Sequence, residues 1–182
     1  MRFEAKICKD KRGREITLRN AELNDAQELL SYQKTTAEET RNLMREPDEC
    51  ELSIDDEKAF IESYLDDERQ LLLIAVVDGK HVGNCALMSQ GELSRFKHRG
   101  RIGIALYQKY CGQGIGRLLL ENVLDVAKKL GYEQVELEVM AGNKQAIALY
   151  ESVGFINFGT LPKNMKYKDG TYTDAYFMVK QF

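Results

Sequence analysis

A glycine-rich turn between a predicted strand and the most regular helix of the sequence limits the possible folds more than any other segment. Residues 102–107 form the predicted strand, and the turn contains Gly112, Gly114 and Gly116. Apolar residues that recur on one face over 115–130 predict the helix. Unpaired backbone N–H groups at a helix N-terminus attract an anion, and glycines let the anion approach closely. The turn therefore predicts either a phosphate-binding site or no more than a tight connection.

Hairpin and helix patterns along the rest of the chain predict an α+β fold. Residues 71–77 and 81–88 flank Asp78-Gly79, a pair that suits a type I′ turn. The basic residues 9–14 are expected to form a solvated turn, and the acidic residues 36–52 an irregular segment. The other predicted elements are strands at 3–8, 15–19, 135–139, 157–161 and 172–179, helices capped by Asn24 or Asp25 and by Ser53, and a helix at 146–152.

Length and charge exclude several classes of protein. The 182 residues fit one domain, 1–182, and a hydrophobic content of 43% is that of a globular chain. A net charge of −3, from 26 basic and 29 acidic residues, provides no basic field for nucleic acid. The longest apolar run, 71–77, is too short for a membrane span, and the mixed-charge start contains no secretory signal. We therefore expect a cytoplasmic protein with neither a nucleic-acid nor a membrane partner.

The cysteine and histidine pattern does not predict a metal site. The closest pair, His81 and Cys85, would lie roughly 13 Å apart on one strand, which is too far to share a metal ion. In a reducing compartment we expect free thiols that serve mostly as small core residues. These cysteines are Cys8, Cys50, Cys85 and Cys111.

A second motif decides between the two interpretations of the glycine turn. A dinucleotide-binding fingerprint needs Gly where Arg117 stands, and the Gly-Lys-Ser/Thr of a P-loop is absent. The segment from Asn143 to Phe155 reads Asn-x-x-Ala-x-x-Leu-Tyr-x-x-x-Gly-Phe, and Cys111-Gly112-Gln113-Gly114-Ile115-Gly116 precedes it at the right spacing. Together the two segments resemble the motifs of the GNAT superfamily of N-acetyltransferases, whose glycine motif is Gln/Arg-x-x-Gly-x-Gly/Ala. The order of the predicted elements extends the resemblance over nearly the whole chain.

The resemblance implies a three-layer α/β/α fold in which helices flank a central mixed, mostly antiparallel twisted sheet. It implies that an acetyl group passes from acetyl-CoA to an amine by direct attack in a ternary complex, without a covalent enzyme intermediate. The acceptor would be a small amine or a peptide N-terminus, and association into a homodimer is left open. A GNAT-like module that only senses coenzyme A, or that serves as a structural subunit, is the alternative function, and a longer acyl donor is a third possibility.

The resemblance also assigns roles to particular residues. The Leu106 N–H would contact the donor near its thioester as an oxyanion donor, and the Tyr150 hydroxyl would protonate the leaving thiolate as general acid. A core aromatic role for Tyr150 is the alternative. Asn143 would hold the pantetheine arm, although it is equally suited to capping a helix. The full donor-binding set is Leu106, Cys111, Gly112, Gln113, Gly114, Ile115, Gly116, Arg117, Asn143 and Tyr150.

Two positions depart from the family pattern. Cys111 replaces the Gln or Arg of the glycine motif, so that one side-chain contribution to diphosphate binding is absent. A helix N-terminus can lower a thiol pKa, which makes Cys111 a conceivable nucleophile, although the family places this position at the diphosphate. Ile102 stands where several relatives carry a glutamate base. The candidate substitutes, besides a water chain, are His98, Glu92, Glu138 and Glu39.

The acidic segment suggests how an acceptor would reach the site. Its carboxylates would create a negative field that attracts a cationic amine before the amine loses its proton. A solvated acidic loop is the alternative interpretation. The residues concerned are Glu39, Glu46, Asp48, Glu49 and Glu51.

Overall fold

The computed structural model describes residues 1–91 and 93–182, in which eight strands form a sheet of order β1-β2-β3-β4-β5-β6-β8-β7. The strands are β1 (Lys6–Lys9), β2 (Glu15–Asn20), β3 (Leu71–Val77), β4 (Lys80–Ser89), β5 (Arg99–Leu106), β6 (Gln134–Met140), β7 (Ile156–Lys166) and β8 (Tyr172–Gln181). The helices are α1 (Ala26–Glu39), α2 (Ile54–Asp66), α3 (Ile115–Lys129) and α4 (Lys144–Ser152). Strands β5 and β6 are parallel, and the other neighbouring strands are antiparallel. The predicted mixed, mostly antiparallel sheet is confirmed.

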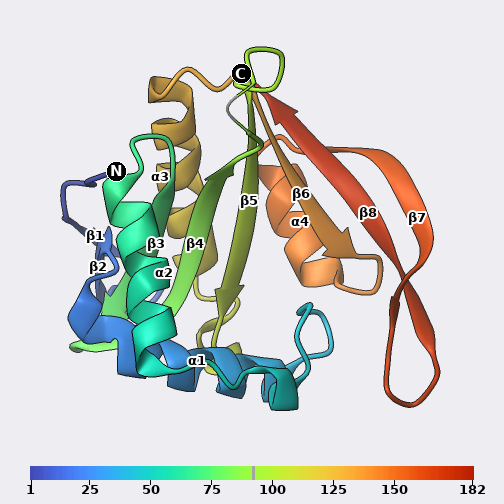
Figure 1. Cartoon of the computed structure of the whole chain (residues 1–182), viewed down its shortest axis with the longest axis horizontal. Helices are drawn as coiled ribbons and strands as arrows, with labels where there is room; N and C mark the ends of the chain where they lie inside the picture. Colours follow the sequence, from blue (N-terminus) through green and yellow to red (C-terminus); the bar gives the residue numbers. More distant parts are fainter. Residues whose placement is uncertain (92) are drawn as a thin grey trace.

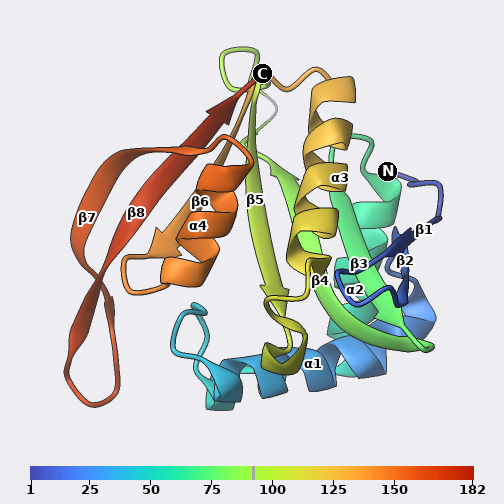
Figure 2. The same ribbon diagram turned by 180° about the vertical axis from the view of Figure 1, so that it is seen from behind.

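Helices cover both faces of this sheet. Figures 1 and 2 show α1 and α2 on one face and α3 and α4 on the other. Because successive side chains of a strand point to opposite faces, Leu71 and Leu73 of β3 pack on the side of α3, whereas Leu72 and Ile74 pack under α1 and α2. Burial on both faces explains why β3 is apolar at every position. The expected three-layer α/β/α arrangement is confirmed.

Several element ends form for the reasons that the sequence indicates. Asp78 and Gly79 have φ of +50° and +75°, as a type I′ turn between β3 and β4 requires. The Ser53 side chain accepts a hydrogen bond of 3.1 Å from the Asp56 N–H and so caps α2. Gly131 follows α3 with φ of +79°, which satisfies the end of that helix in the left-handed region.

Two expectations about the first third of the chain are wrong in part. Helix α1 continues through Glu39, so residues 36–39 are helical rather than irregular. Thr36 is buried there, and its hydroxyl donates to the Tyr32 carbonyl at 2.8 Å. Asp25 precedes α1, but its carboxylate pairs with Arg19 at 2.7 Å instead of capping the helix.

The cysteines and the basic turn also differ from expectation. All four cysteines are free thiols, but Cys85 alone among them is fully buried. The turn between β1 and β2 is not simply solvated, because the Asp10 side chain within it is fully buried. Both differences arise from packing between segments that are distant in sequence.

Candidate active site

The neighbouring strands β5 and β6 separate after a short paired stretch. They pair in register from Arg99 opposite Gln134 to Arg101 opposite Glu136. Strand β4 accompanies β5 as far as Leu106, and β8 accompanies β6 to Met140. The facing edges of β5 and β6 beyond the paired stretch therefore have no ladder between them, and Figure 1 shows the two strands diverging. An opening in the middle of a sheet leaves backbone groups free for a ligand.

The hydrogen-bond register between β4 and β5 leaves the Leu106 N–H pointing into this opening. Tyr107 donates its N–H to the Val82 carbonyl of β4 at 3.1 Å. Alternate residues of a strand bond to the same neighbour, so Ala105 also bonds toward β4 while Leu106 and Ile104 face the other way. The Leu106 N–H thus points toward β6 at the level where β6 has moved away. This direction agrees with the oxyanion role expected for it.

The glycine turn brings the start of α3 against the end of β5. Gly112 and Gly114 have φ of +75° and +93°, a region that favours glycine, and Gly114 immediately precedes α3. A Cβ at Gly116 would lie 3.4 Å from Leu149 of α4 and 3.5 Å from Leu106. No side chain caps this helix, so its first N–H groups are left for an anion.

Three predicted donor-binding side chains are engaged elsewhere. Gln113 is buried; it donates to the Lys109 carbonyl and accepts from the Arg14 guanidinium. Ile115 is fully buried in the core. Arg117 donates to the Ser152 hydroxyl at 2.6 Å and also pairs with a glutamate one turn along α3. Gln113 and Ile115 can therefore offer only their backbone to an anion.

Helix α4 carries the other two predicted residues. The Asn143 side chain accepts a 3.2 Å hydrogen bond from the Ala146 N–H, so it caps α4. Tyr150 is 6% exposed and packs with its ring 5.9 Å from that of Phe155. Its hydroxyl has no hydrogen-bond partner among the residues described, and burial raises the pKa of this phenol well above its usual range. The phenol is therefore protonated at neutral pH, and its raised pKa makes proton transfer to a thiolate less favourable than it would be from an exposed tyrosine.

The thiol of Cys111 is not activated. Partial burial, and secondarily the charge of Glu39, raise its pKa, whereas the sequence suggested that a helix N-terminus could lower it. The Cys111 Sγ lies 3.7 Å from the Tyr107 carbonyl. A nucleophilic role for Cys111 has no support in this geometry.

The candidate bases occupy different places around the opening. The Glu138 side chain on β6 accepts a 2.6 Å hydrogen bond from Asn164 of β7 and lies 3.6 Å from Arg101 of β5. Glu39, at the end of α1, accepts the Gln108 N–H at 2.6 Å. His98 precedes the paired end of β5, the end away from Leu106. Glu92 lies outside the described residues.

Three carboxylates of the acidic segment have partners in the structure. Asp48 forms an ion pair with Lys168 near the tip of the β7–β8 hairpin, and Glu46 and Glu49 bond to each other's backbone N–H groups. A cavity of about 170 Å³ between this segment and β7 is lined by charges of both signs and by apolar side chains. They include Arg41, Leu43, Met44, Arg45, Glu46, Glu49, Met165, Lys166 and Tyr167.

The sequence interpretation missed a contact between the glycine turn and the turn of the β1–β2 hairpin. Lys11 donates its backbone N–H to the Gln113 carbonyl at 2.9 Å. Asp10 accepts from the backbone of Arg12 and Arg14 and from the guanidinium of Arg14, which in turn reaches Gln113. The excess of basic residues over 9–14 is the one sequence feature that indicates this contact. From the sequence alone, these residues are interpreted as a solvent-exposed turn.

Metal-binding clusters and membrane-spanning helices are both absent from the described part of the chain. Within residues 1–91 and 93–182, no group of three His, Cys, Asp or Glu side chains is arranged to hold a metal ion. Over the same ranges, every helix is too short or too polar to cross a bilayer.

Comparison with known proteins identifies the family. Residues 37–155 match the model of the Acetyltransferase (GNAT) family. A ribosomal protein bS18-alanine N-acetyltransferase of Escherichia coli (strain K12) is 49% identical over 76 residues, which are 42% of this chain and 51% of that protein. This match thus spans about half the length of that relative. An N-alpha-acetyltransferase of Saccharolobus solfataricus is 28% identical over 183 residues, covering 94% of this chain and 96% of that one.

The solved structures agree with this assignment. The acetyltransferase of GNAT family from Streptococcus pneumoniae superimposes with a TM-score of 0.87 at 27% identity, covering 92% of this chain and all of that one. The family match takes in most of the chain, including both sides of the opening up to Phe155. The chain belongs to the acetyltransferase (GNAT) family.

Proposed function

We propose that this protein transfers an acetyl group from acetyl-CoA to the α-amino group of a peptide or protein. The opening between β5 and β6 carries the proposal, because the Leu106 N–H and the uncapped start of α3 both present free backbone donors there. Membership of the family supports acetyl-CoA as the donor. The names of the two relatives, one acting on an alanine of a ribosomal protein and one an N-alpha-acetyltransferase, support an α-amino acceptor.

The residues present fit such a donor. The diphosphate would lie against the N–H groups at the start of α3, and the lack of a Cβ at Gly116 lets Leu106 and Leu149 lie close to this end of the helix. The pantetheine arm would run between the separated strands toward Leu106. The Leu106 N–H would then stabilise the thioester oxygen as that oxygen gains negative charge.

The reaction needs two proton transfers besides this stabilisation. The neutral amine attacks the thioester carbonyl carbon, a C–N bond forms, and the C–S bond breaks. The nitrogen loses a proton to a base, and the coenzyme A sulfur gains one from the Tyr150 hydroxyl, which solvent reprotonates. No covalent intermediate on the enzyme is required.

Among the candidate bases, the surroundings of Glu138 favour it most. Arg101 and Asn164 hold its side chain beside the opening, on the face of the sheet that also carries Gly103. Among the described residues, a Cβ at Gly103 would contact Met88 alone, at 3.8 Å, so this position is not tightly packed. The carboxylate of Glu39 lies at the end of α1 and accepts the Gln108 N–H, so it is the second candidate.

Replacing Gly114 by valine is expected to weaken donor binding about tenfold or more. The residue has φ of +93°, and a side chain in the left-handed region costs about 1–2 kcal/mol. The new Cβ would also lie 3.1 Å from the Lys11 side chain, so the turn must move. Calorimetric titration with coenzyme A measures the effect, and Gly170→Val, at another positive φ with open space around it, is the control. An unchanged dissociation constant in folded Gly114→Val would remove the turn from the donor site.

The function itself is tested by the rate of coenzyme A release with a panel of acceptors. Peptides that begin with Ala, Ser or Met are compared with the same peptides blocked at the α-nitrogen, and with polyamines, aminoglycosides and free amino acids. The proposal predicts turnover with free peptides and none with the blocked forms. Turnover only with small amines would mean that the acceptor is a small amine and not a peptide. Tight coenzyme A binding with no turnover would favour a sensor or structural module.

A further inference from the structure

The turn between β1 and β2 adds positive charge to the proposed donor site. Residues 9–14 contain Lys9, Lys11, Arg12 and Arg14 against a single carboxylate, Asp10. Asp10 and Arg14 neutralise each other through a 2.7 Å ion pair. Within residues 1–91 and 93–182, the Lys11 ammonium and the Arg12 guanidinium have no hydrogen-bond or ion-pair partner. Unpaired like charges repel one another, so the sequence keeps them at an energetic cost.

The position of Lys11 is fixed relative to the glycine turn. Its backbone N–H is bonded to the Gln113 carbonyl at 2.9 Å. Its Cγ would lie 3.1 Å, and its Cδ 3.7 Å, from a Cβ placed at Gly114, so its aliphatic stem runs beside the residue that begins α3. The aliphatic part of this side chain therefore lies within contact distance of the glycine turn.

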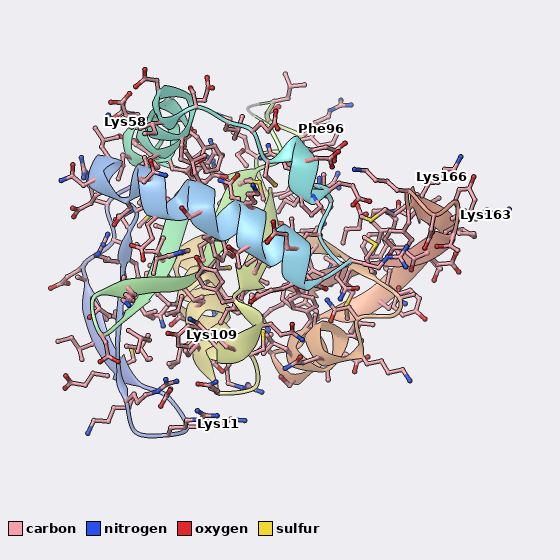
Figure 3. The ribbon with its side chains drawn as sticks, turned by 90° about the horizontal axis from the view of Figure 1, so that it is seen from below. Lys11, Lys58, Phe96, Lys109, Lys163 and Lys166 are labelled. Atoms are coloured by element: carbon pink, nitrogen blue, oxygen red, sulfur yellow. The ribbon has the colours of Figure 1, made fainter. Side chains whose placement is uncertain are left out.

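Buried polar contacts hold the β1–β2 turn in place. The Asp10 carboxylate is fully buried and accepts from the Arg12 N–H at 2.8 Å, from the Arg14 N–H at 3.0 Å and from the Arg14 side chain. Arg14 also donates to the Gln113 side chain, which donates to the Lys109 carbonyl. Figure 3 shows Lys11 and Lys109 at the same side of the molecule, away from Lys58 of α2. The two turns are thus joined into one unit.

This contact falls two residues after a departure in the glycine motif. The family motif places Gln or Arg where this chain has Cys111, whose thiol offers neither an amide nor a positive charge. The turn that carries Lys11 lies outside the residues 37–155 that match the family model. Positive charge that the motif lacks is therefore available from a separate segment of the chain.

We propose that Lys11 binds the diphosphate of the donor, in place of the motif side chain that Cys111 replaces. The proposal rests on the function proposed above. The ammonium group would add a charge-assisted hydrogen bond to those from the backbone N–H groups of the turn. Arg12, also exposed on the same turn, would add to the local positive field that attracts the donor.

The test is the dissociation constant of coenzyme A for the full chain and its variants at low salt. Lys11→Met keeps the aliphatic stem beside Gly114 and removes the charge, so a weakening of about five- to tenfold is expected. Lys11→Arg should restore most of the affinity. Lys58→Met removes the same charge from α2 and should leave the dissociation constant unchanged. The difference between wild type and Lys11→Met should shrink as salt rises, because salt screens charges near the surface.

Donor analogues locate the phosphate that is bound. With 3′-dephospho-coenzyme A the effect of Lys11→Met should persist, and its disappearance would assign Lys11 to the 3′-phosphate and overturn the proposal. With S-acetylpantetheine, which has no phosphodiester, wild type and Lys11→Met should have the same KM. Equal coenzyme A affinity of wild type and Lys11→Met would contradict the proposal while leaving the acetyltransferase function standing. Failure of the wild-type protein to bind coenzyme A would instead overturn the function.

Discussion

Replacing Tyr150 by phenylalanine is expected to lower kcat by about 10²-fold, the lower end of the effects of general acid–base catalysis. The change removes one oxygen from a side chain that is 6% exposed and whose hydroxyl bonds to none of the described residues, so the packing against Phe155 should survive. Without the phenol, coenzyme A must leave as a thiolate that solvent protonates. The measurement is single-turnover acetyl transfer, which separates the chemical step from product release.

A matched substitution separates this role from a structural one. Tyr64 on α2 is also 6% exposed, and burial raises its pKa to about 12, but it lies on the opposite face of the sheet. Tyr64→Phe should leave kcat near that of wild type. If Tyr150→Phe and wild type have equal kcat, Tyr150 has no role in the chemical step. If Tyr150→Phe loses coenzyme A affinity by the same factor as it loses kcat, the role of Tyr150 is packing in the donor site.

Replacing Glu138 by glutamine is expected to lower kcat/KM by about 10²- to 10³-fold, because the amide cannot take the proton of the attacking amine. Glutamine keeps the size of the side chain and can still bond to Asn164, so donor binding should be unaffected. The comparison uses kcat/KM for a peptide acceptor at saturating acetyl-CoA.

Two further variants show whether the loss of activity is specific to Glu138. Glu136→Gln, two residues earlier on β6, loses an ion pair with Arg99 at the paired end of the strands and should retain most of the activity. Glu39→Gln alters the candidate carboxylate on α1, which accepts the Gln108 N–H. A large loss in Glu39→Gln together with a small one in Glu138→Gln would transfer the role of base from β6 to α1.

Local sequence patterns are sufficient to predict most of the helices and strands. The type I′ turn at Asp78-Gly79 and the apolar face of α3 each depend on residues close together in sequence, and the structure confirms both. Residues 36–39 were misassigned because their helical state depends on the burial of Thr36 among distant neighbours. Charge and polarity along the chain, taken alone, indicated a loop there.

The surroundings of the site were harder to predict, because they join segments far apart in sequence. The opening exists because the pairing of β5 and β6 ends at Arg101 and Glu136, and no local pattern marks this end. Glu138 was one of several candidate bases, and the contacts from β5 and β7 distinguish it. The inward orientation of Gln113 likewise depends on Arg14, about a hundred residues earlier in the chain.

Intact-mass analysis of a single turnover tests the central claim, direct acetyl transfer from acetyl-CoA to an amine, most directly. The protein is mixed with limiting acetyl-CoA, first alone and then with a peptide that has a free N-terminus. If transfer is direct, the protein mass does not change at any time and the peptide gains one acetyl group on its α-nitrogen. An acetylated protein that forms without peptide and then passes its acetyl group to the peptide would contradict direct transfer, and a peptide that gains no acetyl group would contradict the function.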